Sequence, residues 1–386
     1  MQRVYFDNAA TTPISEEVIN AIVPVLRGQF GNPSSIHAEG RSVRSVLEAA
    51  RKMVAQCIGA STGEVFFTSG GTESNNMAIK CAVRDMGVTR IISSPTEHHC
   101  GTHTIESVVQ QAGVEVVWLP VNHLGRIDYA DLERALQAGN GAKTLVSLMH
   151  ANNEIGTMID IQRVGALCKE YNAWFHSDTV QTIGHFPLNV QDLNIHFLSG
   201  AAHKFHGPKG VGFIYINSDT AIKPFIDGGA QERNMRGGTE NVYGIVGLAK
   251  ALELACADMD ARMSHIRDIR NYMRAQLEAH FEDIQFNGDL EGESLYTVLS
   301  VSFPPSPKNE LMLFNMDIAG ISVSGGSACS SGAEKGSHVL EAIKADPERK
   351  SIRFSFSHYN TKEEVDFVVD KMKAFVPAKT QEPVLG

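Results

Sequence analysis

Three stretches of the chain carry side chains that together suit a small anionic molecule with a reactive carbonyl group. Gly70-Gly71-Thr72 follows an apolar run and opens a helical pattern, so its free amide groups and the positive helix end could cup a phosphate or a carboxylate. Lys204 follows another apolar run. A lysine at the edge of a buried strand loses proton affinity and becomes a nucleophile toward carbonyls. Asp178 ends a third run, where a buried carboxylate needs a cationic partner.

Each of these signals is weak alone and has a plainer explanation. Thr72 fits a helix N-cap equally well, and the P-loop motif G-x-x-x-x-G-K-[ST] does not occur. Lys209 competes with Lys204, but it follows Pro208 in a turn and is expected at the surface. Taken together, an anion cup, a reactive lysine and a buried aspartate are the parts that hold pyridoxal phosphate (PLP).

The elements that must position these residues are read from apolar patterns. Seven short runs rich in Val, Ile and Phe predict buried strands at 64–69, 90–94, 114–121, 144–150, 174–178, 195–199 and 211–216. Apolar residues at helical spacing lie between several of them, at 41–58, 72–86, 102–112, 128–138 and 160–172. This alternation predicts a mostly parallel seven-stranded sheet flanked by helices on both faces.

The carboxyl ends of parallel strands meet at one edge of a sheet, where ligands bind. Five of the predicted strands lead into polar clusters, which lie at 69–73, 96–99, 152–154, 177–181 and 203–204. Loop residues and helix caps would explain any one cluster. Five clusters at one sheet edge are better explained by a single site.

The alternation of short apolar strands and helices ends near residue 240, which predicts a second structural unit. Residues 241–281 contain no proline and read as one long helix or two helices with a kink. Short strands follow at 296–303 and 351–357. We therefore predict a large α/β domain over 14–255, and a smaller α+β domain formed by 1–13 together with 256–386.

Composition narrows the class of protein. The 386 residues are 43% hydrophobic and carry a net charge of −10, which excludes wholesale disorder and disfavours nucleic-acid or anionic-membrane partners. The sequence has no apolar stretch near 18 residues and no secretory signal pattern. The six cysteines are scattered without a C-x-x-C pair, as is typical of a cytoplasmic protein: Cys57, Cys81, Cys100, Cys168, Cys256 and Cys329.

The sequence resembles the cysteine desulfurases of the NifS/IscS type, within the class V aminotransferase superfamily of fold type I PLP enzymes. The motifs run in family order from residue 4 to about residue 370: YFDNAATTP (5–13), SGGTESNN (69–76), TEH (96–98), NNEIG (152–156), Asp178 with Gln181, HKFHGPKG (203–210), QER (231–233) with Arg236, Gly238-Thr239, SACSSG (327–332) and RFS (353–355). The resemblance therefore covers nearly the whole chain.

The resemblance implies roles for the catalytic and substrate-binding residues. Lys204 would hold PLP covalently and move the Cα proton of the substrate. His98 would stack on the cofactor ring and take part in proton transfer. The Cys329 thiolate would attack the substrate sulfur, while Arg353 and Asn153 would hold the substrate carboxylate.

The resemblance also implies how PLP is bound. Asp178 would pair with the pyridine nitrogen, Gln181 would hydrogen-bond the ring hydroxyl, and Asn153 would lie at the cofactor. The phosphate would be bound by Gly71, Thr72 and His203, joined by Thr239 from the other subunit of a dimer.

The implied protein is a PLP-dependent homodimer that converts L-cysteine to L-alanine. Its sulfur would pass as a persulfide on Cys329 to an acceptor or iron-sulfur scaffold protein. A class V aminotransferase or a selenocysteine lyase is the enzymatic alternative, and a degenerate binding protein is the non-enzymatic one. His98, His99, Cys100 and His103 could instead form a metal cluster, but no metal is expected because structural zinc sites usually show paired ligands elsewhere.

Two positions depart from the family pattern. Ala201 stands where these desulfurases usually have a serine that helps bind the phosphate, so one phosphate hydrogen bond is missing or a neighbour supplies it. Ser357-His358 stands where many relatives have Gly-Arg. The second departure bears on surface charge or substrate-side contacts, and neither departure changes the expected reaction class.

Overall fold

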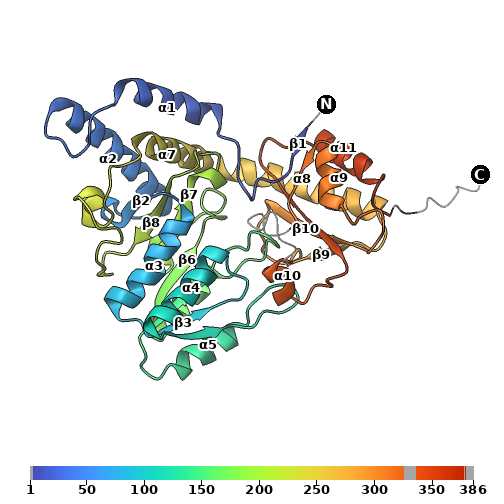
Figure 1. Cartoon of the computed structure of the whole chain (residues 1–386), viewed down its shortest axis with the longest axis horizontal. Coiled ribbons are helices and arrows are strands. Elements are labelled where there is room, and N and C mark those ends of the chain that lie inside the picture. The colour runs from blue at the N-terminus through green and yellow to red at the C-terminus, as the bar shows by residue number, and fades with distance from the viewer. Residues whose placement is uncertain (1–2, 326–335, 378, 380–386) are drawn as a thin grey trace, which may run out of the picture.

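A seven-stranded sheet forms the centre of the computed structural model (Figure 1), which describes residues 3–325, 336–377 and 379. Its strands lie in the spatial order β2 (Val65–Thr68), β8 (Gly212–Ile216), β7 (Phe197–Ala201), β6 (Trp174–Asp178), β5 (Thr144–Ser147), β3 (Arg90–Ser93) and β4 (Glu115–Trp118). Only β8 runs antiparallel to its neighbours in this sheet. The predicted mostly parallel seven-stranded sheet is confirmed.

Helices cover both faces of this sheet, because successive strand residues point to opposite sides and both sides are apolar. Phe66 and Leu145 belong to the core under α3 (Gly71–Met86) and α4 (His99–Ala112). Their neighbours Phe67 and Val146 belong to the opposite core. That core is completed by α1 (Glu16–Gly28), α2 (Ala38–Ile58), α5 (Tyr129–Ala138), α6 (Ile161–Glu170) and α7 (Val242–Ala257).

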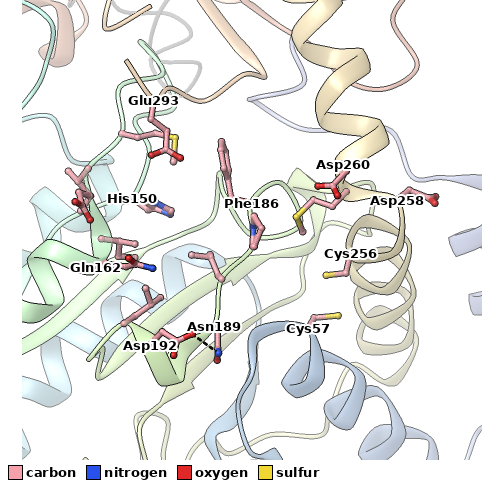
Figure 2. Close-up of a pocket in the computed structure, with 18 of the residues that line it drawn as sticks. Cys57, His150, Gln162, Phe186, Asn189, Asp192, Cys256, Asp258, Asp260 and Glu293 are labelled. Atoms are coloured by element: carbon pink, nitrogen blue, oxygen red, sulfur yellow. Dashed lines mark hydrogen bonds between the residues drawn. The ribbon is translucent and has the colours of Figure 1, made fainter. Parts of the chain in front are cut away.

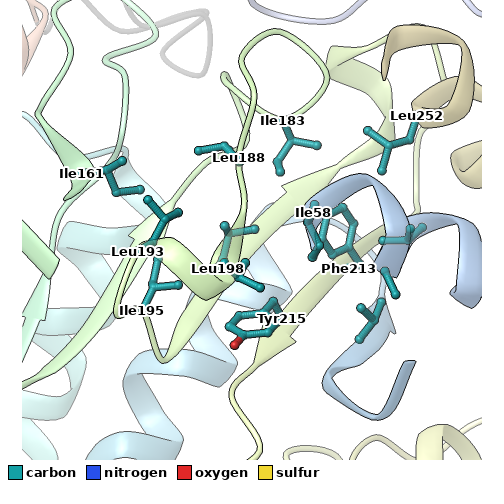
Figure 3. Packing of buried hydrophobic residues seen from close by; sticks show 14 of the residues in the cluster. Ile58, Ile161, Ile183, Leu188, Leu193, Ile195, Leu198, Phe213, Tyr215 and Leu252 are labelled. Carbon is teal, nitrogen blue, oxygen red and sulfur yellow. The ribbon is translucent and has the colours of Figure 1, made fainter. Parts of the chain in front are cut away.

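Figure 3 shows how tightly the second core joins strands to helices. Ile58 from the end of α2 lies beside Phe213 of β8, and Leu198 of β7 and Leu252 of α7 belong to the same core. All four side chains are at most 1% exposed. The helices therefore hold β7 and β8 in place, and these two strands flank the segment 202–211, which contains Lys204.

The C-terminal part has its own core and its own sheets. β12 (Lys350–Ser355), β10 (Val298–Phe303) and β9 (Gln285–Asn287) form an antiparallel sheet. Three helices pack with it or beside it, α8 (Met259–His280), α9 (Met312–Ile318) and α11 (Lys362–Met372), and α10 (His338–Ala342) lies toward the central sheet. The predicted long helical segment is two helices, α7 and α8, which meet at Asp258.

The N-terminal segment lies with this C-terminal part. β1 (Val4–Tyr5) pairs in parallel with β11 (Ile321–Ser322), and Phe6 packs in the same core as β10 and β12. The division into domains at residues 14 and 256 stays a prediction. In the part of the chain that the structure describes, no helix is long and apolar enough to cross a membrane.

Candidate active site

A cavity of about 390 Å³ lies where the strands of the central sheet end. It collects side chains that follow β3, β5, β6 and β7, as the strand-end rule predicts. Nine of the predicted site residues line it: Gly71, Thr72, His98, Asn153, Asp178, Gln181, His203, Lys204 and Arg353. Thr239 lies in a different pocket of the same chain, beside Arg236 and Gly238. Cys329 lies outside the described residues.

The start of α3 forms one wall of the cavity. Gly70 has φ +150°, a conformation that favours glycine and lets the chain turn from β2 directly into the helix. A Cβ atom added to Gly71 would lie 2.6 Å from the Val180 side chain, so only glycine brings this backbone so close. The first turn of α3 therefore presents amide groups and a positive helix end to the cavity, which suits an anion.

Asp178 is a buried carboxylate at the end of β6. Its Oδ2 accepts a hydrogen bond of 2.6 Å from the Asn75 side chain, and its Oδ1 accepts one of 3.0 Å from the Val180 backbone. Asp178 is in none of the ion pairs found within 4.0 Å among the described residues, whereas Arg353 of the same cavity pairs with Asp7. A cationic ring nitrogen in the cavity would supply the missing partner.

The Lys204 amine is positioned by the N-terminal segment. Its Nζ donates hydrogen bonds of 2.6 Å to the Ala9 carbonyl and 2.8 Å to the Ala10 carbonyl, about 195 residues away in sequence. Lys209 lies on an exposed turn and does not line the cavity. The choice of Lys204 as the cavity lysine agrees with this geometry.

His98 has one ring nitrogen engaged by the backbone. It is the N-cap of α4, and its Nδ1 accepts a hydrogen bond of 3.1 Å from the Cys100 amide. The Cys100 sulfur lies 3.0 Å from the same nitrogen. Burial lowers the pKa of His98, so its ring is neutral near pH 7.

Arg353 is the buried cation of the cavity, with only 1% of its surface exposed. Its Nη1 donates to the Asn153 carbonyl at 2.8 Å and its Nη2 pairs with Asp7 at 3.0 Å. Its Nε is buried and has no hydrogen-bond partner among the residues that the structure describes. A buried guanidinium with an unused donor suits a carboxylate ligand. The role of Asp7 was missed, although Asp7 lies within a motif noted above.

Comparisons of the sequence with known proteins identify the family to which the chain belongs. The chain matches the family Aminotransferase class-V over residues 4–368. The chain belongs to the class V aminotransferase family. It is 44% identical over 379 residues to "Cysteine desulfurase IscS" of Dictyoglomus turgidum, covering 97% of this chain and 95% of that protein. It is 41% identical over 371 residues to "Putative cysteine desulfurase IscS 1" of Bacillus subtilis, covering 95% and 96%.

Solved structures also resemble this class V chain over nearly its whole length. A protein described as "NIFS-LIKE PROTEIN" superposes with a TM-score of 0.88 at 36% identity, covering 96% of this chain and 98% of that one. "SspA in complex with cysteine" superposes with a TM-score of 0.79 at 29% identity, covering 93% and 100%. The expected family and fold are confirmed, and enzymes of this family depend on PLP.

The cavity of this class V chain fits PLP. The groups that face it are a lysine amine, the Asp178 carboxylate, which is in no ion pair among the described residues, and a helix N-terminus. Burial lowers the pKa of His203 to about 4, so this residue would meet a phosphate as a neutral hydrogen-bonding group. Gln181 is buried and donates to the Ala9 carbonyl at 3.1 Å. The individual contacts to PLP stay predictions.

A second and larger cavity, of about 1010 Å³, has a different character (Figure 2). Cys57 and Cys256 lie at one side of it, and its lining includes five carboxylates: Asp160, Asp192, Asp258, Asp260 and Glu293. None of the residues found to line it is a lysine or arginine, so it does not suit a phosphate.

The alternative of a metal cluster gains no support, because the described chain has no suitable group of three His, Cys, Asp or Glu residues.

Replacing Asp178 with asparagine is expected to weaken PLP binding about ten- to hundredfold, because a hydrogen bond to a charged group is worth about 1.5–3 kcal/mol. Asparagine keeps the shape of the side chain but removes its charge. The PLP dissociation constant of the purified enzyme checks this. Asp192→Asn, an exposed carboxylate of the larger cavity, is the control and should change nothing. Equal affinities for all three proteins would contradict the role of Asp178.

Replacing Ala201 with serine is expected to tighten PLP binding. Ala201 is buried in the cavity wall, and its Cβ lies 3.8 Å from where a Cβ of Gly71 would be. A serine hydroxyl there would face the anion-binding wall and add a hydrogen bond of roughly 1.5–3 kcal/mol before the cost of ordering it. The rate of PLP loss from the two proteins measures this. An unchanged or faster rate of PLP loss would mean that another group already makes this hydrogen bond.

Proposed function

We propose that this protein converts L-cysteine to L-alanine and passes the sulfur, as a persulfide on Cys329, to an acceptor protein. The observation that carries the proposal is the meeting of Arg353 and Lys204 in one cavity. A buried guanidinium can hold an α-carboxylate, and a lysine amine can exchange with an α-amino group. The substrate is therefore an amino acid.

When bound, PLP supplies an electron-withdrawing ring that stabilises negative charge at Cα of the substrate. Asp178 keeps the ring nitrogen protonated. Lys204 would hold the cofactor and would move the Cα proton of the substrate. Arg353, fixed by Asp7 and by the Asn153 carbonyl, holds the carboxylate, so the reacting bonds have one orientation.

The sulfur step needs a nucleophile other than these residues. The Cys329 thiolate attacks the substrate sulfur, a new S–S bond forms, and the C–S bond of the substrate breaks. The electron pair left on Cβ of the substrate is protonated and the proton that Lys204 removed returns to Cα, which yields alanine and a persulfide on Cys329. An acceptor protein with a thiolate then takes the outer sulfur, and this acceptor serves iron-sulfur cluster assembly or another sulfur pathway.

A homodimer is part of the proposal. Thr239, proposed for the phosphate, lies in a pocket away from the cavity of its own chain, which agrees with service to a second subunit. Large apolar side chains are exposed on α1 and on the segment that leads to α2: Ile19, Leu26, Phe30 and Ile36, the last two at 79% and 87%. Contiguous exposed apolar groups favour a protein interface.

Product analysis separates this function from its alternatives. The enzyme is incubated with L-cysteine, with and without a reductant, and alanine and sulfide are measured. The proposal expects alanine in both cases and sulfide mainly with reductant, since the reductant releases the persulfide sulfur. A requirement for a keto acid would indicate an aminotransferase, and alanine formed only from selenocysteine would indicate a selenocysteine lyase.

A further inference from the structure

The ring proton of neutral His98 has a fixed position. Nδ1 accepts the hydrogen bond from the Cys100 amide, at 3.1 Å. A ring nitrogen that accepts a hydrogen bond carries no proton, so the proton of the neutral ring is on Nε2. Nε2 makes no hydrogen bond with the residues that the structure describes, and His98 lines the cavity.

The Cys100 thiol strengthens this assignment. Its sulfur lies 3.0 Å from His98 Nδ1. Because Nδ1 carries no proton, this contact is attractive only if the thiol proton lies between the two atoms. Burial raises the pKa of the Cys100 thiol to about 12, so the proton is present throughout the working pH range. Cys100 therefore donates to Nδ1 through both its backbone and its side chain.

The Cys100 sulfur is in turn oriented by Asn75. The Asn75 Nδ2 donates to this sulfur at 3.0 Å and to Asp178 Oδ2 at 2.6 Å. Asp178 as a carboxylate only accepts, so the amide must present its nitrogen to both groups. The amide oxygen lies 3.1 Å from His176 Nε2 on the other side. Asn75 thus donates in two directions, to the Asp178 carboxylate on one side and to the sulfur that contacts His98 on the other.

We propose that Cys100 is a positioning residue that holds His98 as a neutral imidazole with its proton on Nε2, so that His98 serves the reaction as a hydrogen-bond donor and not as its base. This inference rests on the proposed desulfurase function. It divides the proton chemistry between two side chains. Lys204 removes the Cα proton, and His98 stabilises negative charge on the reacting groups. To act as a base, His98 would need a lone pair on Nε2, which the contacts of Nδ1 disfavour.

The charges around His98 come from several elements. Asp178 at the end of β6 favours an imidazolium, while Lys204 after β7, His338 of α10 and His103 of α4 oppose it. Protonation at Nδ1 would also set that proton against the Cys100 amide and break the N-cap of α4. These charges and hydrogen bonds together favour the neutral form of His98 over the imidazolium.

The test compares Cys100→Ala and Cys100→Ser with Cys168→Ala, a buried thiol on α6 away from the cavity. NMR of protein labelled with 15N-histidine reports the ring nitrogens of His98, identified by their loss in His98→Gln. The parent should show an unprotonated Nδ1 and a protonated Nε2. In Cys100→Ala, the titration midpoint of His98 and the acid limb of kcat/KM should rise by about half to one pH unit.

Serine should recover most of that shift because its hydroxyl is also a donor, and Cys168→Ala should show none. A protonated Nδ1 in the parent would overturn the proposal, and so would a Cys100→Ala midpoint equal to that of the parent. The parent spectrum alone decides the tautomer even if Cys100→Ala fails to fold. A protein with the expected tautomer that forms no alanine from cysteine would instead refute the proposed function.

Discussion

Lys204→Ala is expected to abolish the visible absorbance of bound PLP and to reduce alanine formation from L-cysteine to the background rate. The reason is that Lys204 is the lysine amine in the cavity, held there by the Ala9 and Ala10 carbonyls. Without it the cofactor has no covalent attachment and the Cα proton has no base. Absorbance spectra and an alanine assay of the purified variant check both effects.

Lys209→Ala is the matched control. Lys209 lies five residues further along, on an exposed turn outside the cavity. This variant should keep the absorbance of bound PLP and most of the activity. If the two variants exchanged these results, Lys209 would be the cofactor lysine and the assignment of the cavity would be wrong.

Cys329→Ser is expected to separate cofactor binding from sulfur transfer. All PLP contacts proposed here involve other residues, so the variant should still bind PLP and its spectrum should still change when cysteine is added. A hydroxyl stays protonated near pH 7 and is a poor nucleophile toward sulfur. Alanine and sulfide formation should therefore fall by orders of magnitude.

Other cysteines provide the controls for Cys329→Ser. Cys81 and Cys168 are buried in the cores on opposite faces of the central sheet, and Cys57 and Cys256 border the larger cavity. Conservative substitution of any of these four should leave turnover largely intact. A Cys329→Ser enzyme that makes alanine and sulfide at nearly the parent rate would point to a lyase or an aminotransferase.

The central sheet was predictable because its strands are apolar on both faces. All seven runs named from the sequence are strands of one sheet. The first and last residues of these strands were less predictable. The run 195–199 is the strand Phe197–Ala201, which reaches Ala201 because that residue pairs with Gly212 of β8. Neither residue has a branched side chain to signal a strand.

Elements that depend on distant partners were missed. β1 and β11 have two residues each and exist because Val4 pairs with Ile321. β9 exists because it pairs with β10. α1 contains Pro24, and proline argues against a helix interior. Local patterns cannot supply these elements, because their stability comes from tertiary contacts.

The site likewise contains residues that the local sequence signals and contacts that it does not. His98, Asp178 and Lys204 were predictable because each follows a recognisable strand. The pairing of Arg353 with Asp7 spans 346 residues, and nothing local to either residue signals it. Cys100 carried one signal, since it is two residues from His98 and just before the helical pattern predicted at 102–112. Nothing in the sequence signalled the contact between Cys100 and Asn75.

The measurement that tests the central claim most directly is mass spectrometry of the enzyme after reaction with L-cysteine without reductant. Free thiols are blocked, the protein is digested, and the peptide that contains Cys329 is weighed. The proposed function predicts that this peptide gains the mass of one sulfur atom, in proportion to the alanine formed. Alanine formed without that gain, or with the sulfur on another cysteine, would contradict it.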